Sequence, residues 1–133
     1  MNTKLLTLSA LESWLEENII EIEKIYEILS DKLSDNPVTL NDQLATAEAW
    51  HARMTSLLAD SNTFLDLKER AEMPGREEKL TDLDRKVTLA AKVAQERRLR
   101  DKLDGICQSI NLRLMLGMGM MKRMAQEKQK FNG

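Results

Sequence analysis

The sequence predicts an all-α fold of three to four helices, in which two long antiparallel helices are followed by a C-terminal helix. Three observations carry this prediction. The chain of 133 residues is rich in Leu, Ala, Glu, Lys, Arg, Met and Gln, with only five Gly and two Pro. Aromatic residues make up 4% of the chain, which argues against much β-sheet. Apolar residues recur every three or four positions over long stretches. This length suits one domain, covering 1–133.

A first helix is predicted over 8–34. Ser9 and Glu12 form a possible capping box at its start, and Pro37 ends it because proline cannot continue a helix. Its apolar stripe comprises Leu8, Leu11, Leu15, Ile19, Ile22, Tyr26, Leu29 and Leu33. The opposite side is acidic, with Glu16, Glu17, Glu23, Glu27 and Asp31. We expect that acidic side to face solvent.

A second helix is predicted over 39–73, starting near Thr39 or Asn41 and closed by Pro74-Gly75. Its expected inner stripe is Leu40, Leu44, Ala47, Met54, Leu57 or Leu58, and Phe64 or Leu65.

The region 76–130 contains no proline and is predicted to form one long basic helix or two helices. Its first stripe is Leu80, Leu83, Val87, Ala90 and Ala94. Its second stripe is Leu99, Leu103, Ile106, Ile110, Leu114, Gly117, Met121 and Met124. A bend is expected at the change of stripe between Ala94 and Leu99 or at the Asp104-Gly105 pair.

Charge is divided unevenly along the chain. Residues 1–74 hold six Lys/Arg and fourteen Asp/Glu, a net charge of −8, whereas residues 75–133 hold fourteen and eight, a net charge of +6. Such a division indicates either an anionic partner for the basic part or head-to-tail self-association.

The segment Leu112–Met121 is apolar on nearly every side, because both the Ile110/Leu114/Met121 side and the Leu112/Leu116/Met120 side lack charge. A helix that is hydrophobic all round must be covered all round. We therefore expect a homo-oligomer; the alternative is a central helix in the core of a monomer. The expected interface residues are Leu103, Ile106, Ile110, Leu114, Gly117, Met118, Met121 and Met124.

A basic cluster precedes that segment, and a basic tail follows it. Clustered cations are what contact with nucleic-acid phosphates requires. The expected contact residues are Arg97, Arg98, Arg100, Lys102, Lys68, Arg70, Lys122 and Arg123. The alternative is a solvated helix face carrying the i,i+4 pairs Glu96–Arg100, Arg97–Asp101 and Arg100–Asp104. Arg98 and Lys102 lack an acidic residue at either i±4 position, which favours them for phosphates.

Catalytic and metal-binding patterns are weak. Glu48-Ala-Trp-His51 has the Glu-x-x-His spacing of di-iron bundles, but His51 is the only histidine and such a centre needs a second motif. Cys107 is the only cysteine, and we expect it to be a small buried hydrophobe. We therefore predict no enzyme activity, no metal and no cofactor. The longest apolar run is too short to span a membrane, so a cytoplasmic protein is expected.

The segment Ile106-Cys-Gln-Ser-Ile-Asn-Leu-Arg113 is followed by the apolar run, by Lys122 and by the end Lys130–Gly133, and it is preceded by the stretch Asp82–Lys86. These features give the C-terminal third a resemblance to the UvsY-type recombination mediators of tailed phages. The resemblance covers roughly Thr81–Gly133 and implies a helical protein that forms rings through its C-terminal region. Such a protein would bind single-stranded DNA and help a RecA-like recombinase to displace single-strand-binding protein in the host-cell cytoplasm.

This chain departs from the family in its middle. Leu57–Leu67 holds no Lys or Arg where the family carries basic DNA-contacting residues, so a DNA surface must rest on Lys68, Arg70 and the later cluster. Two functions therefore stay open. One is an oligomeric single-stranded-DNA-binding accessory protein; the alternative is a helical protein–protein module, such as an inhibitor, chaperone or assembly adaptor, that binds no nucleic acid.

Overall fold

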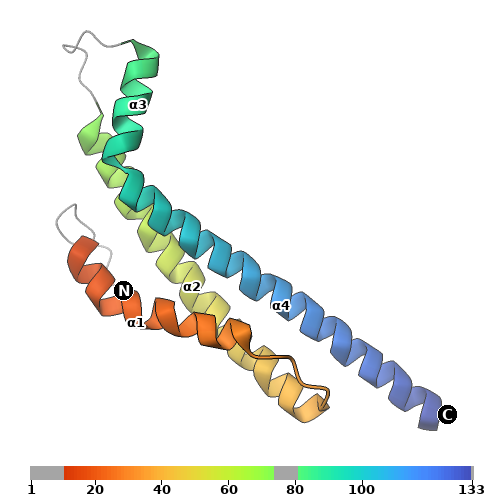
Figure 1. Ribbon diagram of the computed structural model, residues 1–133. Helices are drawn as coiled ribbons and strands as arrows, with labels where there is room; N and C mark the ends of the chain where they lie inside the picture. Colours follow the sequence, from red (N-terminus) through yellow and green to blue (C-terminus); the bar gives the residue numbers. More distant parts are fainter. Residues whose placement is uncertain (1–10, 74–80, 133) are drawn as a thin grey trace.

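The computed structural model describes residues 11–73 and 81–132, which form four helices and no strand. The helices are α1 (Leu11–Ser30), α2 (Pro37–Glu72), α3 (Asp82–Lys92) and α4 (Ala94–Asn132). Figure 1 shows α2 and α4 running side by side in opposite directions, with α1 lying across them. The predicted all-α fold is confirmed. The long antiparallel pair is formed by α2 and the C-terminal helix α4, whereas the sequence predicts two long antiparallel helices that precede a C-terminal helix.

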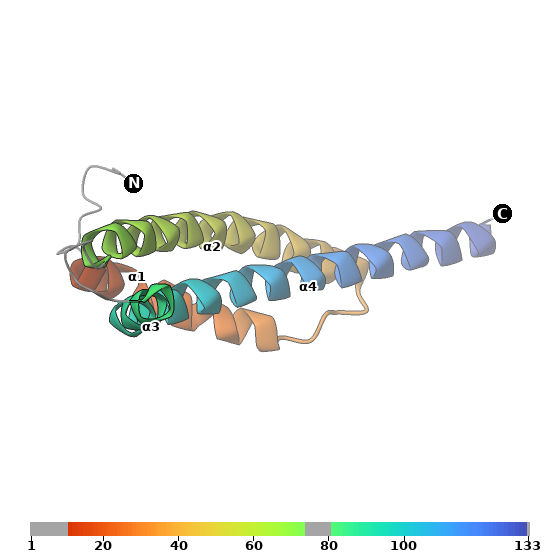
Figure 2. The same ribbon diagram turned by 90° about the horizontal axis from the view of Figure 1, so that it is seen from above.

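The core lies between α2 and α4 and is closed by α1. α2 buries the stripe that the sequence predicts, with Leu40, Leu44, Ala47, Met54, Leu57, Phe64 and Leu65 all facing inward. α4 contributes Leu103, Ile106, Cys107 and Ile110 to the same cluster. The last turns of α4 project beyond the first turn of α2 (Figure 2), so that end of α4 has no helix of its own chain beside it.

The inward face of α1 differs from the predicted stripe. Trp14, Ile22 and Ile25 are buried, whereas Tyr26, a member of the predicted stripe, is 47% exposed. The helix is turned because Trp14 packs edge-on against Phe64 of α2, with ring centroids 5.6 Å apart, and its indole N–H donates to Asp60 at 3.2 Å. Leu8 and the Ser9 half of the predicted capping box lie outside the described residues.

The junction between α1 and α2 differs from the prediction on both sides. α1 ends at Ser30, and α2 begins at Pro37 because Asn36 caps it. The Asn36 side chain accepts from the backbone N–H groups of Val38 and Thr39, and proline is well suited to the first helical position. The carbonyl of Lys32 accepts from the Gln43 side chain, so a side chain of α2 holds the connecting loop.

The basic region forms two helices that meet at Val93, one residue before the stretch Ala94–Leu99 in which a bend is predicted. The backbone N–H of Val93 donates to the carbonyl of Leu89, and the backbone N–H of Arg97 donates to the carbonyl of Val93. Because these bonds continue across the junction, α3 and α4 meet without a loop. Gly105, the other expected bend, lies inside an unbroken helix. α3 buries none of its residues, and Leu83 and Val87 from the predicted first stripe are exposed. Leu80 lies outside the described residues.

Candidate nucleic-acid interface and self-association face

Four of the eight basic residues expected to contact nucleic acid are engaged by acidic residues of the same chain. Lys68 on α2 pairs with Glu96 on α4 at 2.8 Å, and Arg97 pairs with Glu69 at 3.2 Å. The remaining two pairs lie within single helices, Arg70 with Asp66 at 3.1 Å and Arg100 with Asp101 at 2.8 Å. These ion pairs differ from the i,i+4 pairs of the solvated-face alternative, because Arg97 pairs with Glu69 on α2 and Arg100 with the adjacent Asp101.

The Lys68–Glu96 pair is a structural contact. Glu96 is only 3% exposed, and one of its carboxylate oxygens has no hydrogen-bond partner. A carboxylate withdrawn from water in this way needs its cation, so Lys68 cannot leave it for a phosphate without a large cost. Sequence alone cannot reveal this, because Lys68 and Glu96 are 28 residues apart.

The other four basic residues make no ion pair within residues 11–73 and 81–132. In the described part of the chain, Arg98 donates to the backbone carbonyl of Ala94, at 3.3 Å. The Lys102 ammonium lies 5.5 Å from the centre of the Tyr26 ring on α1. Lys122 and Arg123 are exposed and directly follow the apolar segment Leu112–Met121 of α4.

Tyr26 is the site residue that sequence reasoning missed. Its regular spacing among leucines and isoleucines is typical of a core residue, but it is half-exposed beside Lys102. An exposed ring next to a cation, with Arg98 one turn before Lys102 on α4, can accept a stacked base while the cations meet phosphates. The only signal in the sequence is its hydroxyl group, which distinguishes it from its aliphatic neighbours.

The expected oligomer interface divides into an inner and an outer part. Leu103, Ile106, Ile110 and Gly117 are buried within the single chain, and Leu114, Met121 and Met124 are partly buried. Leu103, Ile106 and Ile110 belong to the core of the single chain, and Leu114 packs against it. Their place in an oligomer interface stays a prediction. On the opposite side of α4 four side chains are between 57% and 63% exposed: Leu112, Met115, Leu116 and Met118. We call these four residues the outer α4 face.

Two glycines mark the two sides of α4. A side chain at Gly117 would overlap Leu44 of α2, so this glycine permits the close approach of the two long helices. A side chain at Gly119 would meet nothing within 4 Å. Gly119 therefore leaves open space beside the outer α4 face.

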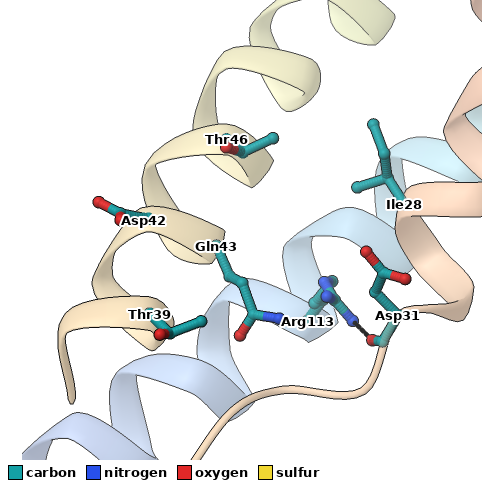
Figure 3. Close-up of a pocket in the computed structure, with 7 residues that line it drawn as sticks. All are labelled: Ile28, Asp31, Thr39, Asp42, Gln43, Thr46 and Arg113. Carbon is teal, nitrogen blue, oxygen red and sulfur yellow. Dashed lines mark hydrogen bonds between the residues drawn. The ribbon is translucent and has the colours of Figure 1, made fainter. Parts of the chain in front are cut away.

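A cavity of about 210 Å³ lies where the end of α1, the start of α2 and α4 meet (Figure 3). Asp31, Asp42 and Arg113 bring charge to it, beside Ile28, Thr39, Gln43 and Thr46. Arg113 donates a hydrogen bond to the backbone carbonyl of Asp31. Arg113, which ends the main motif of the family resemblance, thus ties α4 to the end of α1.

A polar network fastens the middle of α1. Arg53 on α2 donates to both carboxylate oxygens of Glu21, at 2.6 and 3.1 Å, and to the Asn18 side chain at 2.8 Å. The hydrogen bonds from Arg53 lower the pKa of Glu21, and burial opposes that effect only in part. Glu21 and Arg53 also line a second cleft with Ala49 and Trp50, between α1 and α2.

Reactive and metal-binding groups are sparse among the described residues. Cys107 is buried, as expected, and burial raises the pKa of its thiol. No group of three or more His, Cys, Asp or Glu side chains in 11–73 and 81–132 is arranged to hold a metal ion. Within the same ranges, no helix is both long enough and apolar enough to cross a bilayer.

Comparison with known proteins gave no matching family model, no matching curated protein and no matching solved structure. The likeness to UvsY-type mediators stays a prediction, and function must be inferred from the surfaces described above.

Proposed function

We propose that this protein is a homo-oligomeric accessory protein that binds single-stranded DNA, acting in the cytoplasm in support of a RecA-like recombinase. The observation that carries the DNA-binding part is the grouping of Tyr26, Lys102 and Arg98. The ring and both cations are exposed or half-exposed, and neither cation has an acidic partner in the described chain.

The chemistry of this group suits a single strand better than a duplex. A strand without a partner exposes its base faces, and stacking on an aromatic ring does not depend on which base is present. Lys102 and Arg98 lie four residues apart on α4, so their charges can meet neighbouring phosphates. One such group binds weakly, and several copies in an oligomer would bind a strand more tightly through multivalency.

The outer α4 face supports the oligomer. This face exposes more than half of each of four large apolar side chains on one helix. An exposed apolar patch of this kind commonly marks a protein contact. Methionine side chains are flexible and adapt to the shape of a partner, so Met115 and Met118 are suited to a contact between copies. The resemblance of Thr81–Gly133 to recombination mediators is a separate support for the assignment to recombination.

Fluorescence anisotropy with a labelled single-stranded oligonucleotide tests the DNA-binding part. We expect Arg98→Ala/Lys102→Ala to weaken binding and to reduce the slope of log affinity against log salt by about 1 for each phosphate that the variant no longer neutralises. Tyr26→Ala should cost about 1–3 kcal/mol of binding if one base stacks there, whereas Tyr26→Phe should bind like the wild type.

Arg70→Ala/Arg100→Ala is the matched control, because it removes two cations that already have carboxylate partners. Binding should change little in this variant. Equal weakening by both double variants would show that only net charge matters, and wild-type protein that ignores the oligonucleotide at low salt would refute the proposal.

A second candidate function is a protein–protein module without nucleic acid. It is favoured by the neutralisation of Lys68, Arg70, Arg97 and Arg100 inside the chain, and by the exposed carboxylates on α1, which repel phosphates. Under this alternative the outer α4 face binds a protein partner and the anisotropy experiment gives no signal at any salt concentration.

A further inference from the structure

The outward side of α1 carries an apolar residue in acidic surroundings. Ile20 is 70% exposed, although it lies only two residues from the fully buried Ile22. Glu16, Glu23 and Glu27 lie at positions i−4, i+3 and i+7 from Ile20 and are all exposed. These spacings place them along the same side of the helix. We call Glu16, Ile20, Glu23 and Glu27 the acidic α1 face.

Two further charged residues border this face. Glu17 and Lys24 are exposed at positions i−3 and i+4 from Ile20. With four carboxylates and one ammonium, this side of α1 carries a net negative charge. A large apolar side chain at its centre is what a contact with an apolar surface edged by cations would need.

The outer α4 face has the complementary character. Its four apolar side chains are followed by the exposed cations Lys122 and Arg123, which make no ion pair within the described part of the chain. Open space at Gly119 lies between the apolar residues and these cations. Glu16–Glu27 and Leu112–Arg123 both advance eleven residues, or about 16 Å along a helix. The two surfaces therefore match in charge, in apolar content and in length.

One chain cannot bring the two faces together. The side of α1 that carries Ile22 and Ile25 packs into the core with α2 and α4, so the acidic α1 face points away from its own α4. A second copy can supply the missing surface. This gives each copy two different contacts, one through α1 and one through α4.

We propose that the acidic α1 face of one copy docks on the outer α4 face of the next copy, in a head-to-tail assembly. The inference rests on the oligomer of the proposed function and names its contact surfaces. A head-to-tail contact closes into a ring or continues as a filament, depending on the rotation between neighbours. Arg98 lies three to four turns before the outer α4 face, so the contact between copies does not cover it. The Arg98 side chains of successive copies therefore remain available to a DNA strand.

Two variants that each remove one surface test the proposal. The α1 variant is Ile20→Ser/Glu23→Lys/Glu27→Lys, and the α4 variant is Leu116→Ser/Lys122→Glu/Arg123→Glu. All six positions are exposed, and circular dichroism checks that each variant keeps the helical content of the wild type. Asp35→Lys/Glu48→Lys is the charge-matched control, because it reverses two exposed acidic residues outside α1.

Light scattering after size exclusion, at low salt, provides the readout. We expect the wild type and the control to form the oligomer and each variant alone to be monomeric. An equimolar mixture of the two variants should give a species of twice the monomer mass, because one intact face remains on each partner. Raised salt should dissociate this species, since its charge contacts are exposed.

An α1 variant that assembles like the wild type would overturn the proposal, because the outer α4 face would then pair with itself. So would a mixture that stays monomeric, or a wild type that is monomeric at every concentration. Failure of the proposed DNA binding is recognised separately, as a wild-type assembly that forms head-to-tail contacts but leaves the oligonucleotide free in the anisotropy experiment.

Discussion

Lys68 on α2 forms an ion pair with Glu96 on α4. Its ammonium lies 2.8 Å from the carboxylate of Glu96, a residue that is only 3% exposed. We expect Lys68→Ala to lower the free energy of unfolding by up to about 3 kcal/mol, the low end for a broken buried pair, because Lys68 is itself one-third exposed. Urea unfolding measures this loss.

The double variant Lys68→Met/Glu96→Gln provides the control. Because this variant removes both charges, we expect its free energy of unfolding to be closer to that of the wild type than that of Lys68→Ala. If Lys68→Ala is as stable as the wild type while DNA binding falls, Lys68 acts at the nucleic-acid surface after all.

Gly117 and Gly105 are two glycines of α4 whose substitution tests how closely α2 and α4 pack. Both lie inside α4, but a side chain at Gly117 overlaps Leu44, whereas one at Gly105 meets nothing within 4 Å. Gly105→Ala should stabilise the protein by up to about 1 kcal/mol through helix propensity alone. Gly117→Ala should be about 2 kcal/mol less stable than Gly105→Ala, because Leu44 must move within the core. Thermal or urea unfolding that shows equal stability for both variants would contradict the packing of α2 against α4.

At the level of the helices, polar side chains attach α1 to α2 in addition to its buried apolar residues. Arg53 joins it through Glu21 and Asn18, and Asp60 joins it through the Trp14 indole. We expect Arg53→Gln to speed amide hydrogen exchange in α1 and to leave exchange in the centres of α2 and α4 nearly unchanged. Arg70→Gln is the matched control, since Arg70 pairs with Asp66 on the solvent side of α2. Uniform acceleration in all helices would show that α1 unfolds only together with the core.

The attachment of α1 should also depend on pH. Arg53 lowers the pKa of Glu21 below its ordinary value of 4.5. Since the pKa is depressed in the folded state, the stabilisation is complete above that ordinary value and is lost as the pH falls through the lowered pKa. The difference in unfolding free energy between wild type and Arg53→Gln should therefore stay constant from neutral pH down to about pH 5 and shrink below about pH 4. A difference that persists at about pH 2 would exclude Glu21 as the partner that matters.

The elements also show how far the sequence determines the structure. The inner stripe of α2 could be predicted because it repeats over many turns and its leucines have few polar competitors. The face of α1 could not, since Ile25 and Tyr26 are adjacent and both fit an apolar stripe. Contacts of Trp14 with Asp60 and Phe64 determine which of the two residues is buried, and these partners lie about 50 residues away in sequence. For the same reason, the grouping of Tyr26 with Lys102 could not be predicted without the fold.

At the scale of the whole molecule, the uneven charge of the chain is only partly neutralised by folding. Contacts between α2 and the α3–α4 region join Lys68, Arg97 and Lys92 to Glu96, Glu69 and Glu72. The carboxylates on the outward side of α1 and the cations Arg98, Lys122 and Arg123 stay exposed on separate surfaces. A molecule with two unlike exposed surfaces can both assemble with copies of itself and offer cations to a polyanion.

We propose above that the protein assembles and that the assembly binds single-stranded DNA. Light scattering after size exclusion, with and without a fluorescent single-stranded oligonucleotide at low and moderate salt, tests both parts in one measurement. We predict a discrete oligomer that carries the oligonucleotide at low salt and releases it as salt rises. A monomer that elutes apart from the oligonucleotide at low salt would contradict the claim and direct attention to protein partners of the outer α4 face.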